Sequence, residues 1–282
     1  DIDLEKFFDH VNHDILMGKI AKKIKDKRVL RLIRKYLQAG LMQDGMTIRR
    51  EAGTPQGGPL SPLLSNIMLD ELDKELERRG HKFCRYADDC NIYVRSEKAG
   101  NRMLKSVEQF LAKRLRLKLN AKKSACARVN QRKFLGYRLR TGGYLQIAPE
   151  SVKRMKAKVR LLTKRNRGYS LKSIIQSLNR YLIGWLNYFK LGRNKELMRG
   201  LDKWIRRRLR CYRLKQRKRC YPIVTWLMSL GMKENHAWNI GKSSKGWWRL
   251  SRNPVINSAM ANKWLKEQGL YSLLAGYERL NV

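Results

Sequence analysis

The sequence has little negative charge. Its 282 residues include 23 Asp and Glu against 64 Lys and Arg, which gives a formal net charge of +41. Such a field does not suit an ordinary metabolic enzyme for small molecules and calls for a polyanionic partner. Nucleic acid is the first expectation, and an anionic membrane surface is the alternative. Because 43% of the residues are hydrophobic, the basicity is not that of a disordered tail.

Cysteine and long hydrophobic runs are also scarce. The five cysteines are odd in number, irregularly spaced and without a C-x-x-C pair. They therefore disfavour a disulfide framework or a zinc cluster, and they favour a reducing, intracellular setting. No apolar run approaches the roughly 18 residues of a membrane span, and no signal peptide is visible. The chain starts at Asp1 without a Met, so we expect a piece of a longer or processed protein.

The positive charge is concentrated in the later part of the chain. Residues 1–100 have a net charge of +3, and residues 101–282 have +38. The carboxylates of the first part are therefore the place to look for chemistry. A composition shift near residue 150 predicts the main domain boundary, and a rise in Gly and Trp near residue 235 predicts a weaker one.

Local patterns predict a mixed first part and a helical remainder. Alternation over Asp1–Phe8 predicts a short strand with Asp1 and Asp3 on one face. Hairpins are predicted over residues 82–94, with Ala87, Asp88 and Asp89 between the strands, and over residues 134–147. A loop rich in Gly and Pro is predicted over residues 53–62. Helices are predicted over residues 14–40, 62–79 and 100–115, and almost throughout after residue 149; residues 171–189 carry one apolar stripe.

Two groups of carboxylates stand out. One is Asp1 with Asp3 on the first strand, and the other is Asp88 with Asp89 at the hairpin. Mg²⁺ prefers carboxylate oxygen, and two such ions about 3.5–4 Å apart can hold the attacking and leaving oxygens of a phosphoryl displacement. The alternative is that Asp88 and Asp89 are simply turn residues. His10 and His13 lack a third ligand, so a capping or surface role is expected for them.

Five motifs follow one another within about 140 residues. They are residues 3–9 (DLEKFFD), 53–62 (GTPQGGPLSP), 86–89 (YADD), 119–124 (LNAKKS) and 134–137 (FLGY). In this order they resemble the palm motifs of a reverse transcriptase of the bacterial group II intron type. Residues 181–189 (YLIGWLNYF) and 204–210 (WIRRRLR) resemble the thumb, or maturase X domain, of that family.

The resemblance implies an α+β fold: a right-hand polymerase palm with a small antiparallel sheet and helices, followed by an all-α basic thumb and maturase domain. The expected limits are 1–148 for the palm with part of the fingers, 149–235 for the thumb, and 236–282 for a basic, aromatic segment. That last segment either binds DNA or closes the thumb core. An HNH endonuclease domain is not expected. The fingers sequence that precedes the first aspartate motif in the family has no counterpart here, so we expect an N-terminal truncation.

The resemblance also implies roles for single residues. Asp3 and Asp88 correspond to metal-ligating aspartates, Asp89 to their less direct partner, and Lys123 to the lysine at the pyrophosphate leaving group. Asp1 has no such counterpart, and a solvated strand end is expected for it.

Further residues are implied to bind the substrates. Phe8 corresponds to the side chain that excludes a 2′-OH, although core packing is the alternative. The remaining residues implied to bind the incoming nucleotide are Gln56, Gly57 and Tyr86, and those implied to form the primer grip are Phe134, Leu135, Gly136 and Tyr137. Taken alone, the loop of residues 53–62 could be only a tight turn, and the primer grip could be only a β-hairpin.

Basic residues crowd one segment of the second part. They are Arg206, Arg207, Arg208, Arg210, Arg213, Lys215, Arg217, Lys218 and Arg219. Like charges at i,i+4 on a helix repel, and RNA phosphates would relieve that repulsion. Tyr212 and Tyr221 lie among them and are expected to be available for stacking on bases.

The expected function is that of an RNA-directed DNA polymerase with a maturase role, using two Mg²⁺ ions. Its expected partners are group II intron RNA, an RNA template with a DNA primer, target DNA and deoxynucleoside triphosphates, in the bacterial cytoplasm and without a membrane. One alternative is a non-enzymatic RNA-binding maturase or an inactive remnant. Another is a diversity-generating or CRISPR-associated reverse transcriptase, which the thumb-like motifs disfavour.

Overall fold

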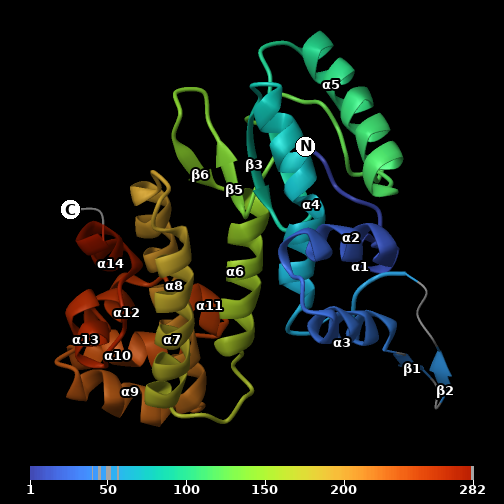
Figure 1. Ribbon diagram of the computed structural model, residues 1–282. Helices are drawn as coiled ribbons and strands as arrows, with labels where there is room; N and C mark the ends of the chain where they lie inside the picture. The colour runs from blue at the N-terminus through green and yellow to red at the C-terminus, as the bar shows by residue number, and fades with distance from the viewer. Residues whose placement is uncertain (40, 44–45, 49–51, 56, 281–282) are drawn as a thin grey trace. The chain divides into compact units, whose positions relative to one another are not determined.

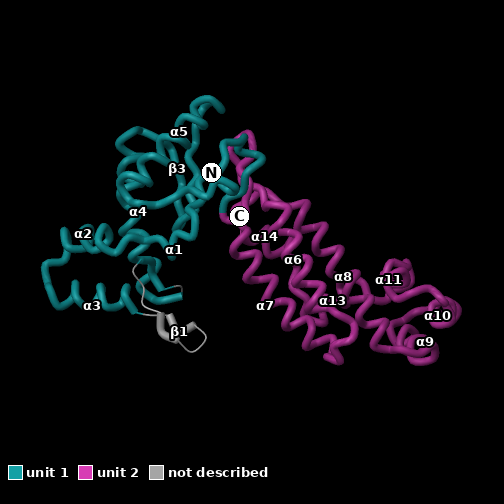
Figure 2. Tube along the Cα trace, turned by 90° about the vertical axis from the view of Figure 1, so that its right-hand side faces the viewer, with its two compact units in different colours: residues 1–134 teal, residues 135–282 magenta. Residues whose placement is uncertain are grey.

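The chain folds into two compact units, Asp1–Phe134 and Leu135–Val282 (Figure 2). A computed structural model describes residues 1–39, 41–43, 46–48, 52–55 and 57–280. No helix in this part of the chain is long and apolar enough to cross a lipid bilayer.

Unit 1 combines helices with two antiparallel hairpins among its described residues (Figure 1). Its elements are α1 (Phe7–His10), α2 (His13–Lys23), α3 (Lys27–Gln38), β1 (Leu41–Gln43), β2 (Met46–Ile48), α4 (Ser61–Arg78), β3 (Lys82–Tyr86), β4 (Asp89–Tyr93), α5 (Glu97–Phe110) and the π-helix η1 (Leu111–Leu115).

Unit 2 begins with one hairpin and is otherwise helical in its described residues (Figure 1). Its elements are β5 (Tyr137–Leu139), β6 (Leu145–Ile147), α6 (Pro149–Leu162), α7 (Leu171–Phe189), α8 (Lys195–Arg217), α9 (Cys220–Ser229), α10 (Glu234–Gly241), α11 (Trp247–Leu250), α12 (Pro254–Ala259), α13 (Asn262–Glu267) and α14 (Leu273–Leu280).

Side-chain caps define where the early helices begin. Asn12 accepts a hydrogen bond from the backbone N–H of Ile15 at the start of α2, and Asp26 caps α3. Such caps satisfy N–H groups that have no partner inside the helix. Because Asp26 starts a new helix, the basic segment predicted over residues 14–40 is two helices.

Two predictions for unit 1 were wrong in detail. The strand predicted over residues 1–8 ends early, because Lys6 has a positive φ and α1 begins at Phe7. In the helix predicted over residues 62–79, the apolar spacing predicts a buried face of Leu63, Leu64, Ile67, Leu72 and Leu76, but Leu63 is 57% exposed. The core-facing stripe of α4 is instead Leu64, Met68, Leu69, Leu72 and Leu76.

The core of unit 1 lies between its helices and the extended segment of residues 1–4. Phe7 is buried there, and Phe8 packs partly against the same cluster. Hairpin β3–β4 contributes Cys90 to this core. Burial raises the pKa of the Cys90 thiol to about 12.

Unit 2 has two hydrophobic clusters. The first joins α6, α7 and α8, which lie side by side in Figure 1, and it buries the whole apolar stripe that was predicted for residues 171–189. The second lies under α9, α10 and α12, where Trp226 is buried and Trp238 and Trp247 are partly buried. Trp264 packs against both clusters. The Trp-rich tail therefore contributes to the core of unit 2, whereas DNA binding by it stays a prediction.

Candidate active site

The extended segment of residues 1–4 pairs with hairpin β3–β4, which carries Asp88 and Asp89. Ile2 donates to the carbonyl of Cys90 (2.7 Å), and Cys90 donates back to Ile2 (3.1 Å), in an antiparallel bridge. In this register Asp3 stands opposite Asp89, at a non-hydrogen-bonded position where facing side chains lie closest. Ile2 and Cys90 point into the core, so alternation along the strands places Asp3 and Asp89 together on the other face.

The turn between β3 and β4 consists of Ala87 and Asp88. The predicted three-residue connection was one residue too long, because Asp89 already pairs with Tyr86 as part of β4. Ala87 has φ +54° and Asp88 does not have a positive φ, which is the φ pattern of a type II′ turn, where glycine is usual. An alanine in this conformation is strained, and such strain tends to be retained at functional sites.

The three carboxylates repel one another electrostatically. The pKa of the Asp89 carboxyl is raised, first by partial burial and then by the negative charges of Asp88 and Asp3, while Lys123 opposes this shift. The ammonium of Lys123 lies 3.5 Å from the Asp3 carboxylate. A cation between these groups would relieve the repulsion.

The segment of residues 119–124 is hydrogen-bonded to the extended segment of residues 1–4. Leu119 bridges Leu4, and the Asp3 carbonyl accepts the N–H of Asn120 (2.9 Å). The Ser124 hydroxyl accepts the N–H of Asp3 (3.0 Å). These contacts explain how Lys123, 120 residues away in sequence, comes to lie beside Asp3.

Arg132 holds the same loop from a second side. Its guanidinium donates to the Asp1 carboxylate (2.8 Å) and to the carbonyl of Lys123 (2.7 Å). Asp1 is therefore an ion-paired anchor, and the expectation of a solvated strand end was wrong.

The residues fit a divalent cation by their chemistry. Asp3, Asp88 and Asp89 offer the oxygen ligands that Mg²⁺ prefers. Burial first, and then the charges of Asp88 and Asp3, raise the pKa of Asp89, so positive charge is favourable at this place. Among the described residues, no three His, Cys, Asp or Glu side chains are already gathered closely enough to hold an ion.

The Gly- and Pro-rich loop docks on the segment that carries Phe8. Thr54 donates its N–H to the Phe8 carbonyl (2.6 Å), and Gly53 donates to Val11 (2.8 Å). A Cβ on Gly53 would lie 2.7 Å from the Phe8 carbonyl oxygen, and the φ of Gly53 is +88°, so only glycine fits this approach.

The other residues expected to contact the nucleotide differ in exposure, and one of them is not described by the structure. Gly57 has φ +79° and open space around its Cα, and Tyr86 is exposed. Gln56 lies outside the described residues. Phe8 is half-buried rather than fully in the core.

Sequence reasoning missed the role of His13. Its ring nitrogen lies 2.7 Å from the Gly53 carbonyl, in a buried hydrogen bond between the start of α2 and the loop. The surface or capping role expected for His13 was therefore wrong. Nothing in the local sequence around His13 points to a partner 40 residues away. Arg132 was missed for the same reason.

The predicted primer grip includes a tight turn that is held by two tyrosines of unit 2, Tyr137 on β5 and Tyr188 on α7. Leu135 and Gly136 both have positive φ. The Tyr188 hydroxyl donates to Leu135 (3.0 Å), and the Tyr137 hydroxyl donates to Tyr188 (2.6 Å). Burial raises the pKa of Tyr137 to about 12, so it stays protonated and keeps donating this bond. Phe134 is the last residue of unit 1.

Much of the basic stretch on α8 is used inside unit 2. Arg210 is 8% exposed and donates to the Met260 carbonyl (3.0 Å). Arg208 donates to the Thr163 hydroxyl (2.6 Å), and Arg207 stacks 3.9 Å from the Trp248 ring centre. Arg213 and Arg217 both lie over Trp226. Burial lowers the pKa of Arg208, Arg210 and Arg213.

The end of the stretch is open to solvent. Lys215, Lys218 and Arg219 are exposed, and Arg206 is half-buried. Tyr221 is exposed as well, whereas Tyr212 is 1% exposed and donates its hydroxyl to the Tyr169 carbonyl (2.6 Å). The expectation that Tyr212 can stack on bases was therefore wrong.

Comparison with known families assigns both units. The family model "Reverse transcriptase (RNA-dependent DNA polymerase)" matches residues 1–139. The model "Group II intron, maturase-specific domain" matches residues 152–229.

Individual relatives are similar to parts of the chain. Protein YkfC of Escherichia coli is 33% identical over an alignment that covers 49% of this chain and 45% of that protein. The group II intron-encoded protein LtrA of Lactococcus lactis is 46% identical over 83 residues, 29% of this chain and 14% of that protein. A 91 kDa protein in the cob intron of Schizosaccharomyces pombe is 41% identical over 81 residues, 29% of this chain and 10% of that protein. The chain spans less than half the length of each.

The first part of the chain is thus a reverse-transcriptase domain in a mixed helical fold with small antiparallel sheets. With the maturase-specific match and the similarity to LtrA, the chain belongs to the group II intron-encoded reverse transcriptases and maturases.

Proposed function

We propose that unit 1 carries the centre of an RNA-directed DNA polymerase, in which Asp3, Asp88 and Asp89 hold two Mg²⁺ ions. The observation that carries this proposal is the pairing of Ile2 with Cys90, which puts Asp3 opposite Asp89 in register. Bound there, the ions would stabilise the attacking and leaving oxygens of nucleotidyl transfer.

Lys123 and Arg132 have complementary parts in this proposal. The ammonium of Lys123, 3.5 Å from Asp3, would donate a proton or a hydrogen bond to the pyrophosphate leaving group. Arg132 binds the carbonyl of Lys123, so it orients the loop rather than touching the substrate.

The incoming deoxynucleoside triphosphate is proposed to lie against Phe8 and the loop docked on it. The aromatic side chain of Phe8 would exclude a 2′-OH, and Gln56, Gly57 and Tyr86 would contact the nucleotide. The support is the hydrogen bond from Thr54 to Phe8, which joins two motifs that are 46 residues apart in sequence.

Unit 2 is proposed to bind nucleic acid, including group II intron RNA as a maturase and the RNA template with its DNA primer. Target DNA is the further proposed partner, and the bacterial cytoplasm is the proposed place of work. The support is the excess of positive charge after residue 100 and the maturase-specific match. The exposed Lys215, Lys218 and Arg219 would contact phosphates, and Leu135, Gly136 and Tyr137 would belong to the primer grip.

The test of the polymerase is primer extension on an RNA template, with the chain and with any longer product of its reading frame. We expect Asp3→Asn and Asp88→Asn each to reduce extension at least about a hundredfold, because the metal contribution is several kcal/mol. The matched control is Asp70→Asn, an exposed carboxylate on α4, which should extend like the parent. Undiminished extension by Asp88→Asn would show the assignment to be wrong. Absence of extension by the parent, with intron splicing that survives Asp88→Asn but fails after neutralisation of Arg206, Arg207, Arg208 and Arg210, would instead support the non-enzymatic maturase.

The nucleotide contact has its own test. Phe8→Val is expected to raise ribonucleotide incorporation about tenfold or more, since loss of a steric exclusion of this size is worth about 1–3 kcal/mol. Extension with mixed nucleotide pools measures the ratio. Unchanged selectivity with normal extension would reject Phe8 as the gate.

A further inference from the structure

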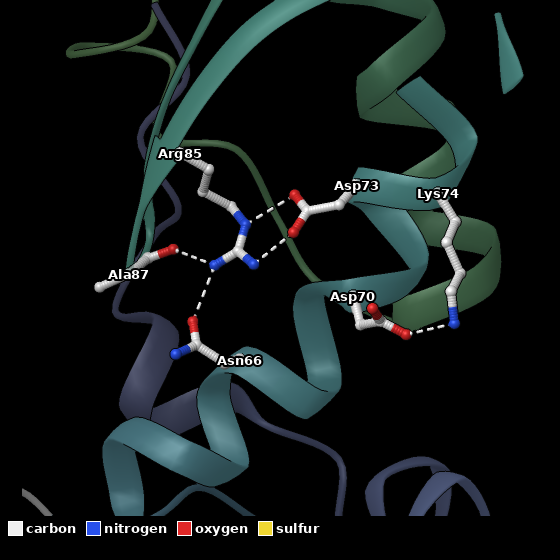
Figure 3. Close-up of polar contacts among 6 residues, drawn as sticks. All are labelled: Asn66, Asp70, Asp73, Lys74, Arg85 and Ala87. Carbon is white, nitrogen blue, oxygen red and sulfur yellow. Dashed lines mark hydrogen bonds and ion pairs between the residues drawn. The ribbon is translucent and has the colours of Figure 1, made fainter. Parts of the chain in front are cut away.

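The guanidinium of Arg85 lies beside the backbone of Ala87, in the turn between β3 and β4 (Figure 3). Its Nε donates to the Asp73 carboxylate (2.7 Å), and its Nη2 makes a second, parallel bond to the same carboxylate. Its Nη1 donates to the Asn66 side-chain oxygen (3.0 Å) and to the Ala87 carbonyl (2.9 Å). One guanidinium therefore joins two turns of α4 to the backbone of the β3–β4 turn.

The pairing of the hairpin puts Arg85 on the side away from the carboxylates. Arg85 pairs with Cys90, and Tyr86 pairs with Asp89. Directly paired residues share a face and neighbouring residues alternate, so Arg85 is on the inner face with buried Cys90. Asp89 is on the outer face. Arg85 has a side chain only 11% exposed, so it supports the turn without access to a substrate on the outer face.

The turn needs such support because of its backbone. Ala87 has φ +54°, a conformation that non-glycine residues adopt only when their surroundings impose it. The bond from Arg85 to the Ala87 carbonyl acts on the strained residue itself. Bidentate Arg–carboxylate pairs are geometrically specific, and Asp73 is fixed on a helix whose other face is packed into the core.

We propose that Arg85, clamped by Asp73 and Asn66, is a positioning residue that sets the Ala87–Asp88 turn and thereby places Asp88 and Asp89 for a divalent cation. This rests on the proposed function, because the cation site is part of it. Arg85 itself touches no reacting atom in this role.

The experiment is a titration of the protein with Mn²⁺ alone, with free Mn²⁺ measured by electron paramagnetic resonance, beside thermal unfolding of the same samples. The key variant is Arg85→Met with Asp73→Met. Replacing both members of an ion pair with apolar residues leaves no unpaired charge and is often neutral for stability. We expect its Tm to stay near that of the parent while its Mn²⁺ affinity falls about tenfold, as for supporting residues around metal ligands.

Two further variants keep the outcome interpretable. Arg85→Lys preserves the charge beside Asp73, but one ammonium cannot reproduce the fork that reaches Ala87, so its Mn²⁺ affinity should also fall. Lys74→Met breaks the exposed pair with Asp70 on the same helix, drawn in Figure 3, and should change neither measurement.

Asp3→Asn separates the two proposals. If Asp3→Asn binds Mn²⁺ as the parent does, the cation site and the proposed function are overturned. If Asp3→Asn loses affinity while Arg85→Lys and the double variant bind like the parent, the cation site stands and the positioning role of Arg85 is overturned.

Discussion

The two units treat their arginines differently. In unit 1 the buried or half-buried cations pair with carboxylates: Arg85 with Asp73, and Arg132 with Asp1. In unit 2 the guanidinium of Arg210 binds a backbone carbonyl, and that of Arg207 lies on a tryptophan ring. Composition explains the difference, because residues 135–282 contain 34 Lys and Arg but only six Asp and Glu.

The contrast shows that a basic segment is not automatically a binding surface. Carbonyl oxygens and aromatic faces accept guanidinium groups without neutralising them. Unit 2 therefore keeps its positive charge although several of its arginines are packed inside it. The packed members of the stretch stabilise unit 2, and its exposed members stay accessible to a ligand.

The largest effect on stability is expected from Arg210→Ala. It removes a buried side chain and leaves the Met260 carbonyl without its donor, which costs about 2 kcal/mol. Denaturant unfolding measures the difference. Arg219→Ala, at an exposed position of the same stretch, should change the free energy of unfolding by less than about 0.5 kcal/mol. Equal losses for the two variants would contradict this division of the stretch.

A smaller but selective effect is expected on RNA binding. Lys215→Gln with Arg219→Gln removes two exposed charges from unit 2. The slope of log K against log salt should then become shallower by about 1.5. Filter binding across a salt series measures it. The control, Lys98→Gln with Arg102→Gln, removes two exposed charges from α5 of unit 1. An equal change of slope in the control would mean that unit 2 is not the preferred RNA-binding surface.

The smallest effect is expected in unit 1, at the carboxylates. Burial and the charges of Asp88 and Asp3 raise the pKa of Asp89, so the fold disfavours the ionised form that prevails at pH 7. Asp89→Asn should therefore raise stability slightly in EDTA, by less than about 1 kcal/mol because the group is partly exposed. Added Mg²⁺ should stabilise the parent more than this variant. Thermal scans with EDTA and with Mg²⁺ make the comparison, and an equal Mg²⁺ effect on both proteins would contradict a cation site at Asp89.

Local sequence patterns predicted the elements well where a periodic segment was long enough to span several turns. The stripe from Leu171 to Phe189 and the helix that became α4 are examples, because several turns of burial leave a clear repeat. Short elements were less predictable. The first strand ends before α1 because of one positive φ at Lys6, which no alternation of residue types reveals.

The candidate site was predictable only as a set of motifs. Their order pointed to the family that the comparisons show. The supporting residues were not predictable: His13 binds Gly53 and Arg132 binds Asp1 and Lys123 through contacts between distant segments. Nor could composition separate Arg210, which is buried, from Arg219, which is exposed.

The sequence by itself determined the sign and distribution of charge, the helical character of the second part and the order of the motifs. These are properties of composition and local period, and they do not depend on which segments meet. The tertiary structure alone decided that Asp3 faces Asp89, that Lys123 lies beside Asp3, and which arginines stay in solvent. Those outcomes follow from pairing register and core packing, which depend on residues up to about 130 positions apart.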